Sequence, residues 1–209
     1  EPQQAKDAIG MIHEAWAKVV QSNVRLHLSN EELAERMARQ AAFVKFAVYE
    51  RLLKGRIHSQ PELQTLTHYA DLSLDGVHFN VAIVDPCAGS DRTGVLNAAM
   101  LQDMDARAIA VREVVLRYES EGIRLHENEE DRIVLIYSGR SLDVRLCRTE
   151  LHRLLEQIRD TLTREFRIGA TIAVGAFCSQ PLDLARAYEQ AKTAWNAHAW
   201  DEDSQIVWF

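Results

Sequence analysis

The residues with the clearest potential for chemistry form one acidic stretch, Glu127-Asn128-Glu129-Glu130-Asp131. Carboxylate oxygens bind divalent metal ions, and such ions in turn hold the phosphates of nucleotides. A nucleotide-handling site could therefore lie here. The simpler interpretation is a hydrated hairpin tip, because the stretch separates two runs that are typical of strands.

Two other patterns could indicate a phosphate-binding loop and a zinc site, and the residues support neither. Residues 88–94 resemble a phosphate-binding loop, but Val95 follows where such a loop needs lysine and then serine or threonine. An ordinary turn and helix cap is favoured there. The eight histidines show no close pairing with one another or with cysteine that would indicate zinc. We expect His126, beside the acidic stretch, to be a surface residue of a strand rather than a base.

A predicted hairpin positions the acidic stretch. Before it, Ile123 and Leu125 alternate with polar residues, as in a strand with one hydrated face. After it, Ile133 to Tyr137 is apolar on both faces, which predicts a central strand covered on both sides. Ser138-Gly139 is predicted to be a turn.

The rest of the chain predicts a mixed sheet packed with helices, an α/β (α+β) fold. Before the hairpin we expect a helix ended by Gly55, and a short helix from Pro61 with Leu63, Leu66 and Tyr69 facing inward. From residue 77 the predicted order is strand, helix, strand, strand, helix, strand, helix, strand. The predicted ranges outside the hairpin are 77–84, 101–118, 144–166, 170–177, a helix from Pro181, and 206–209.

The first 28 residues predict a helix with a coiled-coil-like apolar seam. Its members recur at steps of three and four residues and include one asparagine, which can fix helix register in a coiled coil: Ile9, Ile12, Trp16, Val19, Asn23 and Leu26. A single amphipathic helix on its own domain is the alternative. We predict a helical connector over residues 1–40, with possible dimerisation through this seam, and a regulatory domain over residues 41–209.

Composition narrows the class of protein. The chain has 209 residues with 47% hydrophobic and 26% charged residues, as in ordinary soluble domains. A net charge of −7 without a basic cluster argues against direct nucleic-acid binding. The apolar runs are too short to span a bilayer and no signal peptide opens the chain, so we expect no membrane insertion. Three widely spaced cysteines fit reduced thiols and a cytoplasmic location: Cys87, Cys147 and Cys178.

Three segments together resemble a known family. They are FVKFAVYERLLKG (43–55), HFNVAIVD (78–85) and the run from TIAVGAF to LDLARAYEQAKTAWNA (171–197). This pattern resembles the degenerate GGDEF-like domains in the middle of AraC-type, YesN-like transcription regulators and response regulators of two-component systems. In diguanylate cyclases the same nucleotidyl-cyclase-like fold is catalytic. The resemblance places Asp85 at the first metal-binding aspartate and residues 128–132 at the glycine-rich turn.

The resemblance also implies that the catalytic machinery is degenerate. Asn128 and Glu129 stand in the glycine places, where their side chains would crowd an approaching nucleotide. Cys87 replaces the second aspartate and is a poor magnesium ligand. The family's inhibitory Arg-x-x-Asp motif is missing too, since Arg117 is followed by Ser120. Asp85 with Glu129 or Glu130 could still form a two-carboxylate patch, which makes these three the candidate nucleotide-binding residues. We expect no catalytic residues, no bound metal and no cofactor.

The preferred interpretation is a non-catalytic signalling and dimerisation domain of a bacterial DNA-binding regulator. An upstream receiver or sensor would act through the N-terminal helix, and a helix-turn-helix domain would follow Phe209 in the full-length protein. The alternative is a GTP-type nucleotide-binding or residual diguanylate-cyclase-like domain. A small-molecule sensor is a third possibility.

Overall fold

The structure is a computed structural model, and it describes residues 36–37, 40–86, 98–127, 133–198 and 205–209. The chain divides into two compact units, Glu1–Val44 and Lys45–Phe209. The predicted seam from Ile9 to Leu26 lies outside the described residues, and the predicted division at residue 40 stays a prediction. Among the residues described, no helix is long and apolar enough to cross a membrane.

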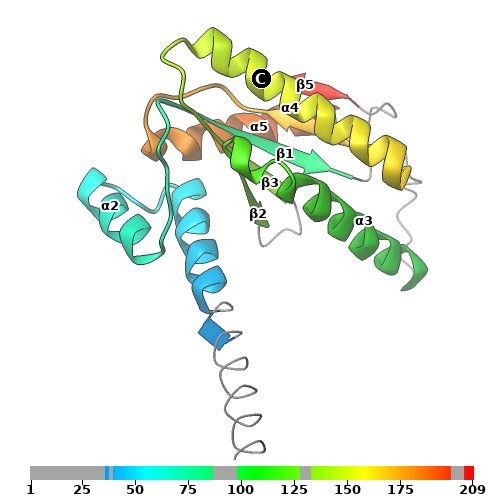
Figure 1. Cartoon of the computed structure of the whole chain (residues 1–209), viewed down its shortest axis with the longest axis horizontal. Coiled ribbons are helices and arrows are strands. Elements are labelled where there is room, and N and C mark those ends of the chain that lie inside the picture. Colours follow the sequence, from blue (N-terminus) through cyan, green and yellow to red (C-terminus); the bar gives the residue numbers. More distant parts are fainter. Residues whose placement is uncertain (1–35, 38–39, 87–97, 128–132, 199–204) are drawn as a thin grey trace, which may run out of the picture. The chain divides into compact units, whose positions relative to one another are not determined.

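The second unit is built on a five-stranded sheet (Figure 1). Its strands lie in the order β2-β3-β1-β4-β5. Neighbouring strands are antiparallel, except that β4 and β5 run parallel. The bounds are β1 (His78–Asp85), β2 (Ile123–Glu127), β3 (Ile133–Gly139), β4 (Thr171–Val174) and β5 (Ile206–Trp208). The mixed sheet, the α+β class and the order of elements after residue 77 are as predicted.

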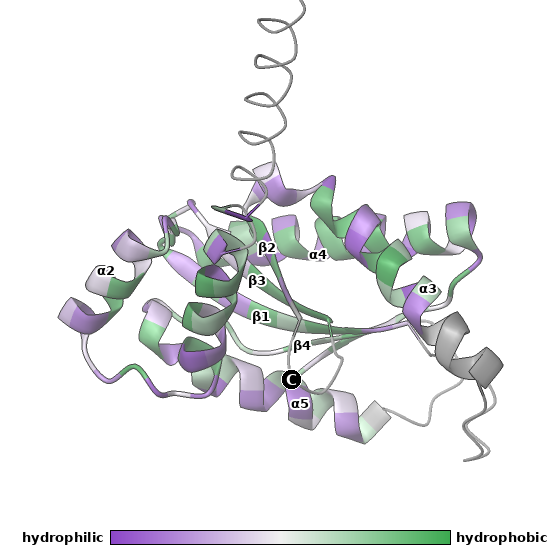
Figure 2. Cartoon of the chain, turned by 90° about the horizontal axis from the view of Figure 1, so that it is seen from below, coloured by the Kyte–Doolittle hydropathy of each residue, from purple (hydrophilic) through white to green (hydrophobic). Residues whose placement is uncertain are grey.

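Helices cover both faces of the sheet. Helices α3 (Ala98–Leu116) and α4 (Val144–Thr161) pack on one face, and α5 (Leu184–His198) packs on the other, with the apolar strands between them (Figure 2). The run from Ile133 to Tyr137 is buried throughout, because successive side chains point to opposite faces and both faces are covered. This confirms the predicted central strand.

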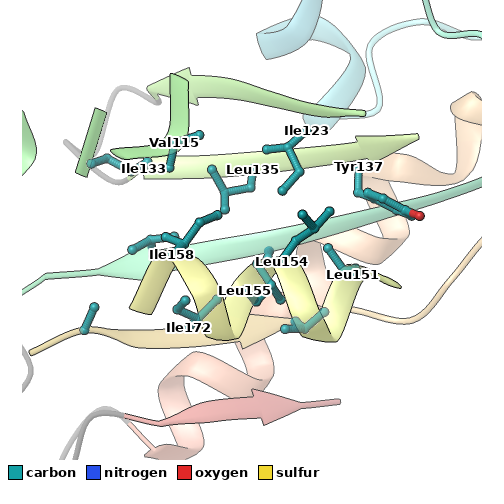
Figure 3. Packing of buried hydrophobic residues seen from close by; sticks show 14 of the residues in the cluster. Val115, Ile123, Ile133, Leu135, Tyr137, Leu151, Leu154, Leu155, Ile158 and Ile172 are labelled. Carbon is teal, nitrogen blue, oxygen red and sulfur yellow. The ribbon is translucent and has the colours of Figure 1, made fainter. Parts of the chain in front are cut away.

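The larger part of the core lies between the sheet and helices α3 and α4 (Figure 3). Aliphatic side chains from every one of these elements interdigitate there, and each fully buried leucine or isoleucine contributes about 2 kcal/mol of hydrophobic stabilisation. The labelled members are Val115, Ile123, Ile133, Leu135, Tyr137, Leu151, Leu154, Leu155, Ile158 and Ile172.

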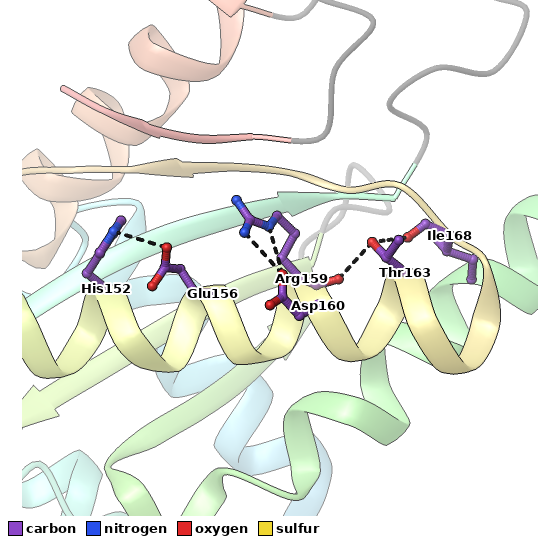
Figure 4. Close-up of polar contacts among 6 residues, drawn as sticks. All are labelled: His152, Glu156, Arg159, Asp160, Thr163 and Ile168. Carbon is purple, nitrogen blue, oxygen red and sulfur yellow. Dashed lines mark hydrogen bonds and ion pairs between the residues drawn. The ribbon is translucent and has the colours of Figure 1, made fainter.

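Helix α4 has a defined start and a polar outer side. The Asp143 carboxylate accepts a hydrogen bond from the Arg145 N–H at 2.8 Å, which satisfies one of the unpaired donors of the first turn. The outer side carries short-range polar contacts, such as His152 to Glu156 at 3.6 Å (Figure 4). Exposed pairs of this kind contribute less than about 1 kcal/mol each. The helix continues as a π-helical turn, Leu162–Phe166, so the predicted range 144–166 is confirmed.

Two helical segments precede the sheet. A helix spans residues 40–53, and Gly55 follows it with a φ of +64°, which is the predicted stop. Helix α2 (Gln60–Tyr69) buries Leu63, but Tyr69 is 79% exposed, so its predicted inward position is wrong. At 100° per residue, Ala70 and not Tyr69 shares the face of Leu63, and Ala70 is buried.

Three other local predictions need correction. Ser138 and Gly139 belong to β3 and form no turn, because β1 is long enough for His78 to pair with Gly139. The strand predicted over 170–177 is limited to Thr171–Val174. The helix predicted from Pro181 begins with a 3-10 turn, Pro181–Asp183, and becomes α-helical at Leu184.

Candidate functional site

Asp85 is the last residue of β1. It lies at the end of the sheet where β2 ends and β3 begins. It pairs with Thr171 of β4, while the preceding Val84 pairs with Ile133, the first described residue after the acidic stretch. The register therefore brings the carboxyl end of β1 beside the two ends of the hairpin turn. This adjacency is what the family resemblance implied for Asp85.

The Asp85 carboxylate accepts a hydrogen bond from an indole. Trp195 Nε1 donates to Asp85 Oδ2 at 3.0 Å. Trp195 lies on α5 and packs against a small apolar cluster of Ala173, Ala194 and Val207. This hydrogen bond ties Asp85 to the helix on the far face of the sheet. Sequence reasoning did not reveal this partner, which is 110 positions away.

No wider ligand set is found around Asp85 among the described residues. In that part of the chain, no group of three or more His, Cys, Asp or Glu side chains is placed to hold a metal ion. The other two candidates, Glu129 and Glu130, lie outside the described residues, as do Cys87 and the loop at 88–94. The predicted two-carboxylate patch therefore stays a prediction.

A polar cluster that sequence reasoning missed lies on the face of β2 opposite the α3 core. His126 is 2% exposed, so its predicted surface position is wrong. Its Nε2 lies 2.8 Å from Glu50 Oε2, and Lys54 Nζ lies 2.5 Å from Glu50 Oε1. The rings of Phe46 and Tyr49 flank the imidazole, with centroids 4.9 and 6.0 Å away.

The error about His126 has a simple cause. Alternation along β2 put Ile123 and Leu125 on the α3 side, and the opposite face was expected to be hydrated. Instead Phe46, Tyr49 and Glu50 cover that face at His126. The available signal was the carboxylate of Glu50 within an otherwise apolar helix face, because a buried acid needs a basic partner.

A small pocket lies at the other end of the hairpin strands. Its volume is about 150 Å³, and its lining includes Gly122, Tyr137, Ser138, Arg140 and Glu150. The Tyr137 hydroxyl donates to Glu150 Oε2 at 2.7 Å. Burial, aided by this carboxylate, raises the pKa of Tyr137 far above its ordinary value, so the hydroxyl stays a proton donor. The pocket is too small for a nucleotide.

Comparison with known protein families identifies the family of this chain. The family model of the GGDEF-like domain matches residues 54–197. The chain belongs to the GGDEF-like domain family. None of the curated proteins compared with the chain matches it. Asp85, Trp195 and His126 all lie within the matched part of the GGDEF-like domain, and Glu50 lies just before it.

The cluster at Glu50 shifts the pKa values of two of its own members, Glu50 and Tyr49. Burial opposes ionisation of Glu50, but the hydrogen bonds from Lys54 and His126 outweigh it, so the pKa of Glu50 falls below its usual 4.5. Burial raises the pKa of Tyr49 to about 12. Glu50 is therefore an anion at neutral pH, held between two basic side chains.

Replacing Glu50 with glutamine should lower the free energy of unfolding by about 1.5 kcal/mol at pH 7. A carboxyl whose pKa is depressed by folding stabilises the fold above its unfolded pKa and loses that effect as pH falls through the folded value. The difference between wild type and E50Q should thus shrink as pH falls below 4.5. Urea unfolding between pH 7 and pH 3 measures it. A difference that stays constant with pH would contradict the assignment.

Proposed function

We propose that this chain is a non-catalytic signal-transmitting and dimerisation domain of a bacterial DNA-binding transcription regulator of the AraC type. The proposal is that it relays a signal from an upstream receiver or sensor to a helix-turn-helix domain of the same full-length protein. The N-terminal connector would bring two copies together through the seam from Ile9 to Leu26. Binding DNA would be the task of the other domain, in line with the net charge of −7.

The observation that carries the non-catalytic part is the hydrogen bond from Trp195 to Asp85. In a nucleotide cyclase the aspartate at this strand end must present its oxygens to a divalent metal ion. Here one oxygen accepts from an indole at 3.0 Å, and the ring occupies the space next to it. A metal ion at this oxygen would have to share it with a donor that is anchored in the α5 packing. Asn128 and Glu129 in the glycine positions of the turn support the same proposal.

Calorimetry with GTP and Mg²⁺ tests the proposal against its alternative. We expect no heat of binding for the wild-type chain. The matched variant is Asp85→Asn, which keeps the shape of the side chain and removes its charge. Heat with wild type that is lost in D85N would support the alternative, a nucleotide-binding domain. Thermal unfolding of both samples checks that they are folded.

Light scattering on the same preparation tests the dimerisation part. We expect wild type to be a dimer, and a variant with Trp16→Glu and Leu26→Glu to be a monomer, because two charges on the seam oppose pairing. Gln21→Glu, off the seam on the same predicted helix, is the control and should stay dimeric. A wild-type chain that is monomeric at high concentration would contradict this part.

A further inference from the structure

The cluster around Glu50 joins two parts of the domain that are far apart in sequence. Glu50 belongs to the helix over residues 40–53, and His126 belongs to β2, 76 positions later. Both side chains are buried: the exposed fraction is 11% for the Glu50 side chain and 1% for that of His126. Lys54, one turn further on, contacts the second oxygen of Glu50. The carboxylate is thus held at both oxygens.

This contact differs in kind from the packing around it. Apolar contacts such as those of Val48 and Leu52 tolerate small displacements, because the hydrophobic effect is not directional. A buried ionic hydrogen bond is directional, and breaking it leaves a charge in a poorly solvated site. The Glu50–His126 pair therefore fixes which part of the helix faces which part of β2.

The strand that receives this contact is an edge strand of the sheet. β2 lies at the end of the sheet and pairs with β3 alone among the described strands. His126 is also the penultimate residue of β2, immediately before Glu127 and the acidic stretch. A displacement of the helix that acts on His126 would therefore move the end of β2 that leads into the acidic stretch.

We propose that the Glu50–His126 pair is the contact through which a displacement of the helix over residues 40–53 is transmitted to the β2–β3 hairpin. It rests on the proposed signal-transmitting function and names the place where the signal enters the sheet. The pair couples the helix and the hairpin, in addition to any stability that it gives to the domain.

Hydrogen exchange followed by mass spectrometry tests the coupling in the full 209-residue chain. Ala42→Gly loosens the helix at an exposed position without removing a buried contact. In an otherwise wild-type chain, it should speed exchange of the amides in Ile123–Glu127 by about fivefold. In an E50Q background, where the charged contact is gone, adding Ala42→Gly should leave these amides unchanged. His126→Phe, which keeps a ring between Phe46 and Tyr49, should have the same effect as E50Q.

The matched control breaks a different contact of the same helix. Arg51 pairs with Glu62 of α2 at 2.7 Å, so Glu62→Gln loosens the helix from α2 and leaves β2 alone. In that background, Ala42→Gly should still speed exchange in β2 by about fivefold.

Three results would overturn the proposal. One is an Ala42→Gly effect on β2 of equal size with and without Glu50. Another is no effect on β2 in the wild-type background while the helix itself exchanges faster. The third is faster amide exchange throughout the domain, α4 included, in the E50Q and His126→Phe variants. The pair would then only stabilise the domain as a whole. None of these results bears on GTP binding or on dimerisation, so failure here is distinguishable from failure of the proposed function.

Discussion

Replacing Gly175 with alanine should destabilise the domain by about 3 kcal/mol or more, the largest effect we expect from a single methyl group. A Cβ atom at residue 175 would lie 2.1 Å from the carbonyl oxygen of Ala187 and 2.9 Å from its carbonyl carbon. Both are backbone atoms of α5, so no side-chain rotation can relieve the overlap.

The backbone of Gly175 is held just as firmly on its own side. Its N–H donates to the Val81 carbonyl at 2.8 Å, and its carbonyl accepts from Asn80 Nδ2, also at 2.8 Å. Because β1 holds the backbone of Gly175 in place, a Cβ atom at this position would push α5 away from the sheet. The close approach of α5 to the sheet therefore depends on the missing side chain.

Thermal and urea unfolding of Gly175→Ala measure this effect. The control is Ala176→Ser, the next position, whose side chain is exposed and which should change stability by less than about 0.5 kcal/mol. A Gly175→Ala variant as stable as the control would mean that α5 does not lie against the sheet at this point.

Replacing Leu155 with alanine should lower the free energy of unfolding by about 3 kcal/mol. Leu155 is fully buried in the cluster between α4 and the sheet (Figure 3). Truncation removes its buried surface and leaves a cavity that the surrounding strands and helices can close only in part. For a domain of this size the melting temperature should fall by roughly 10 °C.

The same helix supplies the control for this substitution. Leu146 is 61% exposed on α4, so Leu146→Ala removes the same atoms from a site that water already reaches. It should change stability by less than about 0.5 kcal/mol. Equal losses for Leu155→Ala and Leu146→Ala would contradict the packing of α4 described above.

Much of the fold could be predicted from the sequence because the signals are local. The stop at Gly55 and the helical range 144–166 each depend on neighbouring residues alone. The continuous apolar run from Ile133 to Tyr137 similarly identified the strand that is buried on both faces. The order of elements after residue 77 and the mixed sheet followed from these local patterns.

The failures share a different cause. Ser138-Gly139 has the composition of a turn, yet β1 is long enough to continue pairing through both residues. Tyr69 continues the apolar spacing of Leu63 and Leu66, yet the buried face of α2 contains Ala70 instead. In both cases the partner element, and not the local composition, set the outcome.

The candidate site divides in the same way. The sequence by itself determined that Asp85 ends a strand and that the acidic stretch before Ile133 contains no glycine. Only the tertiary structure decided what these groups contact. Trp195 reaches Asp85 because α5 packs across β1 and β4, and His126 is buried because residues 46–50 cover its face of β2. Residue spacing reports which face a side chain is on, but burial and charge pairing depend on what covers that face, and the elements that do so here come from distant parts of the chain.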